Sequence, residues 1–207
     1  MFIKHRGFEP VVDSSVFVAP TAVLVGKVNI VKDSRIMYGA VLDSEGSKIE
    51  IGESTIICEN AAIRATASGD KDHPVLIGDH VFIGPHATLL GCTIEPCSYI
   101  ATGATVLQGA VIHSGAVVAV GALVHANAVV PGGFFIPPNT IAIGDPIRIY
   151  SPDEKEVLAD AIKSIGFAKI AFGIEAKWED RLSRYRQITE VRSKEFGNHL
   201  DDVILEK

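Results

Sequence analysis

The sequence predicts an all-β protein in which residues from about 11 to 148 form a single parallel β-helix. Two regularities indicate this fold. Aliphatic anchor residues recur every six positions, apart from two breaks and one step of five between Leu89 and Ile94, and a small residue, usually alanine, follows many anchors after four positions. The anchors are Val18, Leu24, Ile30, Ile36, Ile51, Ile57, Ile63, Ile77, Ile83, Leu89, Ile94, Ile100, Val106, Ile112, Val118, Val124, Val130 and Ile136.

Each six-residue unit is interpreted as a short strand followed by a corner, and three units close one triangular coil. The anchor points inward, the small residue fits the corner, and Gly or Asn adopts the backbone shape that β-branched residues resist. Coils then stack about 4.8 Å apart as parallel strands. Each buried anchor contributes about 1.5–3 kcal/mol once a neighbouring coil covers it. Ordinary sandwich strands would not keep one six-residue register for so long.

The chain divides into a β-helix over 1–150 and a C-terminal helical extension over 151–207. Ser151-Pro152-Asp153-Glu154 has the N-cap, N1 proline and capping-box acid of a helix start. We expect one helix from there to about Ser164 and a second over 177–196. Two polar breaks, 43–50 and 65–75, interrupt the coils, and loops on a rigid scaffold often carry function.

Composition excludes several classes of function. The net charge is −6 and no basic stripe is present, so we expect no nucleic-acid partner. No apolar run is long enough to span a bilayer, which predicts no membrane partner. The first six residues lack the apolar core of a secretion signal, and three cysteines suit a reducing compartment. We therefore expect a cytoplasmic protein.

One segment resembles a known family. The run from Ile77 to Ile94, IGDHVFIGPHATLLGCTI, is similar to the signature of the γ-class carbonic anhydrase-like branch of hexapeptide-repeat proteins, as is the opening segment from Pro10 to Gly26. The resemblance covers roughly residues 8–150. It implies a left-handed β-helix and a homotrimer, with a zinc ion between subunits held by three histidines.

The three positions that match those histidines hold other residues. Arg64 follows Ala61-Ala62-Ile63, Pro85 follows Ile83-Gly84, and Leu90 precedes Gly91-Cys92. Guanidinium, pyrrolidine and isobutyl groups donate nothing to zinc. We therefore expect no metal, no cofactor and no carbonic anhydrase activity by the family's mechanism.

The supporting positions differ as well: Asp43-Ser44-Glu45 and Cys58-Glu59 stand where the family has an Arg-Gly-Asp and a Gln-Asp. The main hypothesis is a small-molecule site in the intersubunit cleft, where Arg64 clamps a carboxylate or another anion. The alternative is that Arg64 pairs with Glu59 or Glu45 and only holds the trimer together. The predicted catalytic residues are His86, Arg64 and Glu59, and the predicted substrate-binding residues are Asp43, Glu45, Cys58, His80 and His73.

Two other functions stay open. In an acyltransferase using acyl-CoA, His86 would be the general base; against this, His86 falls at a side-wall position and its ring could simply be solvated. In a non-catalytic assembly protein, an apolar exposed face would be expected instead of an open polar cleft around Arg64 and His86. His73, His80 and His86 could also form a relocated metal site, although their spacing matches no known motif.

Cys92 and Cys97 share the outward phase of adjacent repeats. We expect them to be small packed residues rather than a redox or metal pair.

Overall fold

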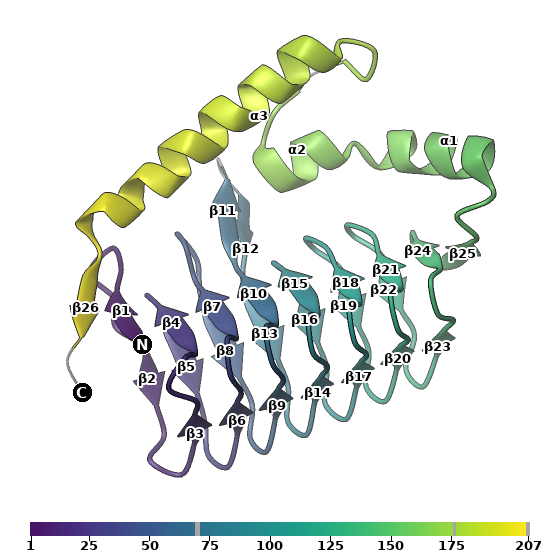
Figure 1. Cartoon of the computed structure of the whole chain (residues 1–207). Helices are drawn as coiled ribbons and strands as arrows, with labels where there is room; N and C mark the ends of the chain where they lie inside the picture. The colour runs from purple at the N-terminus through teal and green to yellow at the C-terminus, as the bar shows by residue number, and fades with distance from the viewer. Residues whose placement is uncertain (69–70, 176, 206–207) are drawn as a thin grey trace.

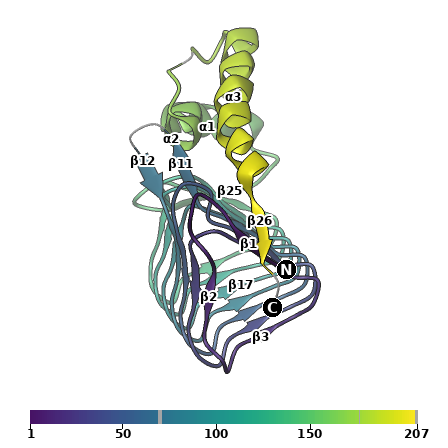
Figure 2. The same cartoon turned by 90° about the vertical axis from the view of Figure 1, so that its left-hand side faces the viewer.

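The computed structural model describes residues 1–68, 71–175 and 177–205 and contains the predicted β-helix, which is left-handed. Figure 1 shows the coils stacked side by side, and Figure 2, which looks along the stack, shows their triangular outline. The three sides of the triangle are three parallel sheets, here called faces 1, 2 and 3 in the order in which each coil visits them.

Each coil contributes one strand to each face, and the strands of successive coils on the same face pair in register. Face 1 contains β1 Phe2–Lys4, β4 Val23–Val25, β7 Val41–Asp43, β10 Ala62–Arg64, β15 Thr88–Leu90, β18 Thr105–Val106, β21 Leu123–Val124 and β24 Ile141–Ile143. Face 2 contains β2 Val11–Val12, β5 Val28–Ile30, β8 Ile49–Ile51, β13 Val75–Ile77, β16 Thr93–Ile94, β19 Val111–Ile112 and β22 Val129–Val130. Face 3 contains β3 Phe17–Val18, β6 Arg35–Ile36, β9 Ile56–Ile57, β14 Phe82–Ile83, β17 Tyr99–Ile100, β20 Val117–Val118 and β23 Phe135–Ile136.

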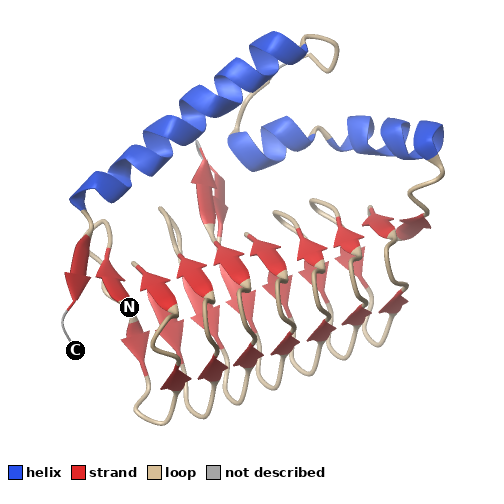
Figure 3. Ribbon diagram, viewed as in Figure 1, coloured by secondary structure: helices blue, strands red, loops and turns tan. Residues whose placement is uncertain are grey.

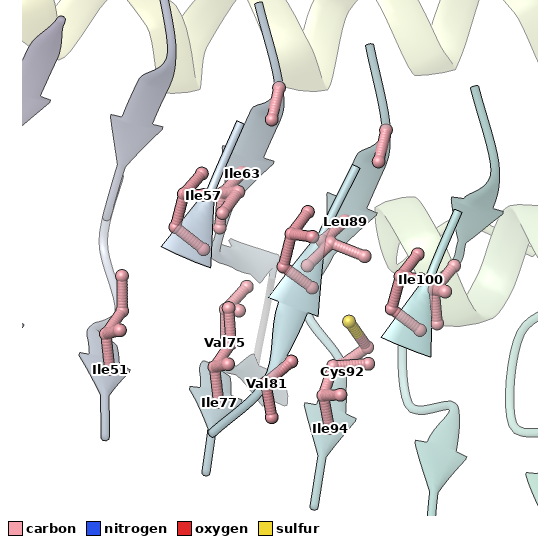
Figure 4. Close-up of a cluster of buried hydrophobic side chains, with 14 of the residues drawn as sticks. Ile51, Ile57, Ile63, Val75, Ile77, Val81, Leu89, Cys92, Ile94 and Ile100 are labelled. Carbon is pink, nitrogen blue, oxygen red and sulfur yellow. The ribbon is translucent and has the colours of Figure 1, made fainter. Parts of the chain in front are cut away.

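The six-residue anchors form the core, as predicted. Every anchor except the half-buried Val18 is buried, and so are the alanines that follow the anchors. Like side chains stack on each other between coils; for example, Ile83 pairs with Ile57 on one side and with Ile100 on the other. Figure 4 shows such a section of the interior. Long-range stacking of equivalent positions thus fixes the register of every strand.

The corners need residues with unusual backbone angles. Gly109 has a φ of 74°, and a Cβ built there would lie only 2.1 Å from the Asn127 Oδ1 in the next coil. Asn127 itself has a φ of 57°. The Gly and Asn residues at the corners therefore follow from backbone geometry and close stacking.

Both ends of face 1 are covered by an antiparallel strand. β25 (Arg148–Tyr150) pairs with β24, and β26 (Val203–Leu205) pairs with β1. These strands pair an edge that would otherwise offer free backbone groups. Because β26 lies within 151–207, this extension is not wholly helical. The sequence did not predict this strand.

The two breaks in the repeat differ from each other. The second break contains an antiparallel hairpin, β11 (Thr66–Ser68) with β12 (Lys71–His73), which rises toward the helices. The first break stays against the β-helix, and its residues Asp43, Ser44 and Glu45 are buried. It is therefore not a solvated excursion.

Three helices lie over the corner between faces 1 and 2 (Figures 1 and 3). They are α1 (Lys155–Ile165), α2 (Phe167–Phe172) and α3 (Arg181–Phe196), and the 3-10 helix η1 (Gly197–Asp201) follows α3. The expected helix start at Ser151 is wrong by several residues. The Glu154 carboxylate does accept a hydrogen bond from the Ser151 N–H at 2.6 Å, but this closes a turn before α1. No helix among the described residues is long and apolar enough to cross a membrane.

Candidate functional site

The predicted site residues lie at three different corners of the triangle. Asp43 and Arg64 end strands of face 1, at the corner where the chain turns to face 2; this is corner 1–2. Arg64 pairs in register with Asp43 on one side and with Leu90 on the other. Two of the three positions that match the family's zinc ligands are therefore direct neighbours.

At corner 1–2, Arg64 is bound by two acidic side chains. Its Nε lies 3.3 Å from Glu45 Oε1 and 3.6 Å from Asp43 Oδ2. The acids are almost fully buried, with side chains 3% and 8% exposed, whereas the Arg64 side chain is 39% exposed. The predicted pairing of Arg64 with Glu45 is thus present within one chain, and no pairing with Glu59 occurs in the described part of the structure.

Glu45 is shared with a second arginine from α3. Arg192 Nη1 donates to Glu45 Oε2 at 3.0 Å, and its Nη2 donates to the other carboxylate oxygen. The ring of Phe196 stacks on both guanidinium groups, at 4.3 Å from Arg192 and 5.2 Å from Arg64. This arrangement docks the end of α3 on corner 1–2.

The contacts of Arg64 leave one edge of its guanidinium open. Both acids approach the Nε side and Phe196 lies against the face. Across residues 1–68, 71–175 and 177–205, no hydrogen bond or ion pair joins Arg64 Nη1 or Nη2 to another group. These two nitrogens form the fork that binds carboxylates in bidentate fashion.

Glu59, Cys58 and His86 lie at corner 3–1, where the chain passes from face 3 to face 1. The His86 backbone N–H donates to the Glu59 carbonyl at 2.9 Å, so the two residues are stacked in adjacent coils. His86 is exposed and has a φ of 58°, which corrects the expected side-wall position: it is a corner residue. Burial, and then the charge of Glu59, raise the pKa of the Cys58 thiol.

His80 and His73 occupy two further places. His80 lies at corner 2–3 with a φ of 55°. His73 lies in β12, close to corner 1–2, where a Cβ built on Gly91 would approach its Cβ to 2.6 Å. The three histidines His73, His80 and His86 do not form a metal-binding group within the described residues.

The two outer cysteines differ from the expectation. Cys92 is buried in the core, where burial raises the pKa of its thiol to about 12, and Figure 4 shows it among the apolar side chains. Cys97 is exposed at a corner with a φ of 60°. The expectation that both side chains point outward is therefore wrong for Cys92, which is buried. The expectation that both are packed is wrong for Cys97, which is exposed.

Sequence reasoning missed the residues that the C-terminus adds at corner 1–2. Besides Arg192 and Phe196, His199 lies 3.6 Å from Asp43 and stacks on His5. No periodicity marks these positions, because the pairing of β26 with β1 brings them in from the other end of the chain.

The residues at the family's zinc positions do not fit a zinc ion. Arg64 and Leu90 are register neighbours and offer a cation and an alkyl group. Pro85 lies at corner 3–1, just before β15 begins, whereas Leu90 lies at the opposite end of that strand. None of the three side chains has a donor atom for the metal.

Comparisons with known proteins agree with this fold and branch. The chain is 42% identical over 102 residues to γ carbonic anhydrase 1, mitochondrial, from Arabidopsis thaliana, covering 48% of this chain and 37% of that protein. It is 34% identical over 95 residues to a probable carbonic anhydrase from Methanocaldococcus jannaschii, covering 46% and 57%. The matched part thus spans well under two thirds of these relatives. No family model matches.

Among solved structures, a hexapeptide transferase family protein from Anaplasma phagocytophilum superimposes with a TM-score of 0.51 and 23% identity, over 95% of this chain and 97% of that chain. At this identity the likeness concerns the fold. Together the comparisons confirm the resemblance that the sequence indicated: this chain has the hexapeptide-repeat β-helix and is similar to γ carbonic anhydrases over about half of its residues.

Proposed function

We propose that this chain is a γ-carbonic anhydrase-like protein that forms a homotrimer without the family's zinc site and binds a small anion in the cleft between subunits. The open Nη1–Nη2 edge of Arg64 carries this proposal. Two buried carboxylates form ion pairs with the Arg64 Nε, without a hydrogen bond, and Phe196 lies against the face of the guanidinium. A ligand carboxylate would therefore meet a preorganised fork, and little rotamer entropy would be lost on binding.

The trimer arrangement follows from the positions that replace the zinc ligands. Arg64 and Leu90 lie along one edge of face 1, and Pro85 and His86 lie beyond the opposite edge. In a cyclic trimer these two edges meet between neighbours when face 1 is directed toward the threefold axis. His86 of one subunit would then complete a cleft around Arg64 of the next.

A second candidate function, a non-catalytic assembly protein, is favoured by face 3. Outward apolar side chains follow one another in register on this face, and Arg35 separates Phe17 from them. The ladder consists of Ile56, Phe82, Tyr99, Val117 and Phe135. Tyr99 is 42% exposed and Phe135 is 56% exposed. An extended apolar patch of this kind is typical of a protein-binding surface.

The acyltransferase alternative has less support. A general base of this type is normally oriented by a third group. Among the residues that the structure describes, no hydrogen bond or ion pair holds the exposed His86 ring.

The proposal is tested by ligand-induced shifts in the melting temperature of the full chain with bicarbonate, acetate, malonate and acetyl-CoA. We expect one of the small anions to raise Tm by about 3 °C at tenfold its dissociation constant. The shift should be absent in Arg64→Gln and reduced in Arg64→Lys, which loses the planar fork. Arg148→Gln, an exposed arginine in β25, is the control and should keep the full shift.

Equal anion-induced shifts in the wild type and in Arg64→Gln would refute the proposed site. Stabilisation by acetyl-CoA alone, lost in His86→Ala, would favour the acyltransferase instead.

A further inference from the structure

We propose that His5, His199 and Asp202 form a binding site for one divalent transition-metal ion of the zinc class, which ties the C-terminus of the chain to its first coil. The site is separate from the positions that match the family's zinc ligands. It rests on the geometry of the two chain ends.

Strand pairing brings the three residues together. Lys4 in β1 pairs with Val203 in β26, so His5 and Asp202 are the next residues along these two antiparallel strands. His199 lies one turn earlier, in η1. One donor atom from each residue lies within 4.8 Å of the other two.

Asp202 lies between the two imidazole rings. Its Oδ1 is 2.5 Å from His5 Nδ1 and its Oδ2 is 2.9 Å from His199 Nδ1. No lysine or arginine in the described ranges pairs with Asp202, and the two rings are the partners of its carboxylate oxygens. Two imidazole nitrogens and one carboxylate are a common donor set for zinc and its neighbours.

The second nitrogen of His199 faces a carboxylate. Its Nε2 lies 3.6 Å from Asp43 Oδ2, an ion-pair contact that is longer than a hydrogen bond. Ligating histidines almost always donate the other ring N–H to a carboxylate or carbonyl, which fixes the tautomer. A small tilt of the ring would let Nε2–H donate to Asp43 and would direct Nδ1 toward the ion.

His5 meets Asp202 through the nitrogen that would bind the ion. Its side chain is 1% exposed, and its Nε2 is buried without a partner. Coordination would replace the hydrogen bond between His5 Nδ1 and Asp202 Oδ1 with a bond from each atom to the ion, and the proton of the neutral ring would then sit on Nε2. No other hydrogen bond of the His5 ring is broken by this change.

Ion binding requires only local movement. The two rings lie nearly parallel, with centroids 4.2 Å apart, and must tilt so that both Nδ1 atoms point to one centre. His199 is 28% exposed and Asp202 is 19% exposed, which leaves a path from solvent and a coordination position for water.

The test is a titration of the chelator-stripped full chain with Co²⁺, followed by visible absorption and by Tm. We expect one Co²⁺ per chain, displaced by Zn²⁺, and a rise in Tm of about 5 °C at a hundredfold excess over the dissociation constant. His199→Ala and Asp202→Asn should weaken binding at least tenfold, and Asp43→Asn should weaken it by roughly 10–100-fold. These variants avoid the fully buried His5, whose replacement could prevent folding.

His113→Ala is the matched control. His113 also pairs with a carboxylate, Glu95, at 2.9 Å, but within the described part of the chain no third ligand joins them, so the variant should leave the titration unchanged. Absence of a stoichiometric cobalt complex in the wild type would overturn the proposal, and so would unchanged affinity in His199→Ala and Asp202→Asn. Binding that depended on His86 would place the metal elsewhere and would also overturn it.

Discussion

Glu45 is the residue on which the polar cluster at corner 1–2 depends. It is buried, and it accepts contacts from Arg64 in the β-helix and from Arg192 in α3. A buried carboxylate of this kind is stable only while its partners are in place, because the desolvation of the charge must be compensated. Glu45 thereby connects the proposed anion clamp to the docking of α3.

We predict that Glu45→Gln lowers the free energy of unfolding by about 2 kcal/mol. This is less than the 3–5 kcal/mol typical of a fully buried pair, since Arg64 is partly exposed to solvent. Urea unfolding of the full chain measures the change. Glu95→Gln, at the exposed pair with His113, is the matched control and should leave the midpoint unchanged. An equal decrease in the free energy of unfolding in both variants would contradict the prediction, because the buried Glu45 would then contribute no more to stability than the exposed Glu95.

The contacts of a residue were predictable where the six-residue register places its partner in an adjacent coil. The pairing of Arg64 with Glu45 could be foreseen because Arg64 ends one strand of face 1 and Glu45 lies two residues beyond the end of the strand in the adjacent coil. Arg192, His199 and Asp202 could not, because they reach the same corner from a segment that lies outside the six-residue register. His5 gave no signal for the same reason.

At the scale of elements, face 1 and face 3 suggest different roles. Face 1 is bordered by the positions that the resemblance matches to zinc ligands, and face 3 carries the apolar ladder. Phe82 and Tyr99 stack on that ladder with ring centroids 5.3 Å apart. The small-anion proposal therefore depends on face 1, whereas the assembly alternative depends on face 3.

We predict that the double variant Tyr99→Ser and Phe135→Ser remains a trimer, because the proposed subunit contact involves face 1. Light scattering on the full chain measures the mass. Both side chains point outward, so their loss should not disturb the core. Conversion to monomers would instead assign the subunit contact to face 3 and would support the assembly function.

Element boundaries were predictable in the β-helix but less so after it. A buried anchor in every coil marks each strand, whereas the helices α1 to α3 have few buried positions. The turn at 151–154 has the residues of a helix start, but α1 begins only after it, with Glu154 as the N-cap, so capping residues alone misplaced the boundary.

At the scale of the whole molecule, the regular stacking of coils determines which positions far apart in the sequence become neighbours in space. Because Arg64 and Leu90 are in register, the two replaced zinc positions are neighbours in this chain. These two positions correspond to zinc ligands only through the resemblance, and the side chains of Arg64 and Leu90 offer no donor atom to a metal. Fold and resemblance were therefore predictable from the hexads, whereas the ligand and the subunit arrangement depend on contacts between chains.

The most direct test is stopped-flow measurement of CO₂ hydration by the full chain in the presence of added zinc. Zinc-bound water supplies the hydroxide in this reaction, and the side chains of Arg64, Pro85 and Leu90 cannot hold the ion in the cleft. We predict hydration at the rate of the buffer alone. A zinc-dependent acceleration of CO₂ hydration that persists in His199→Ala would contradict the account.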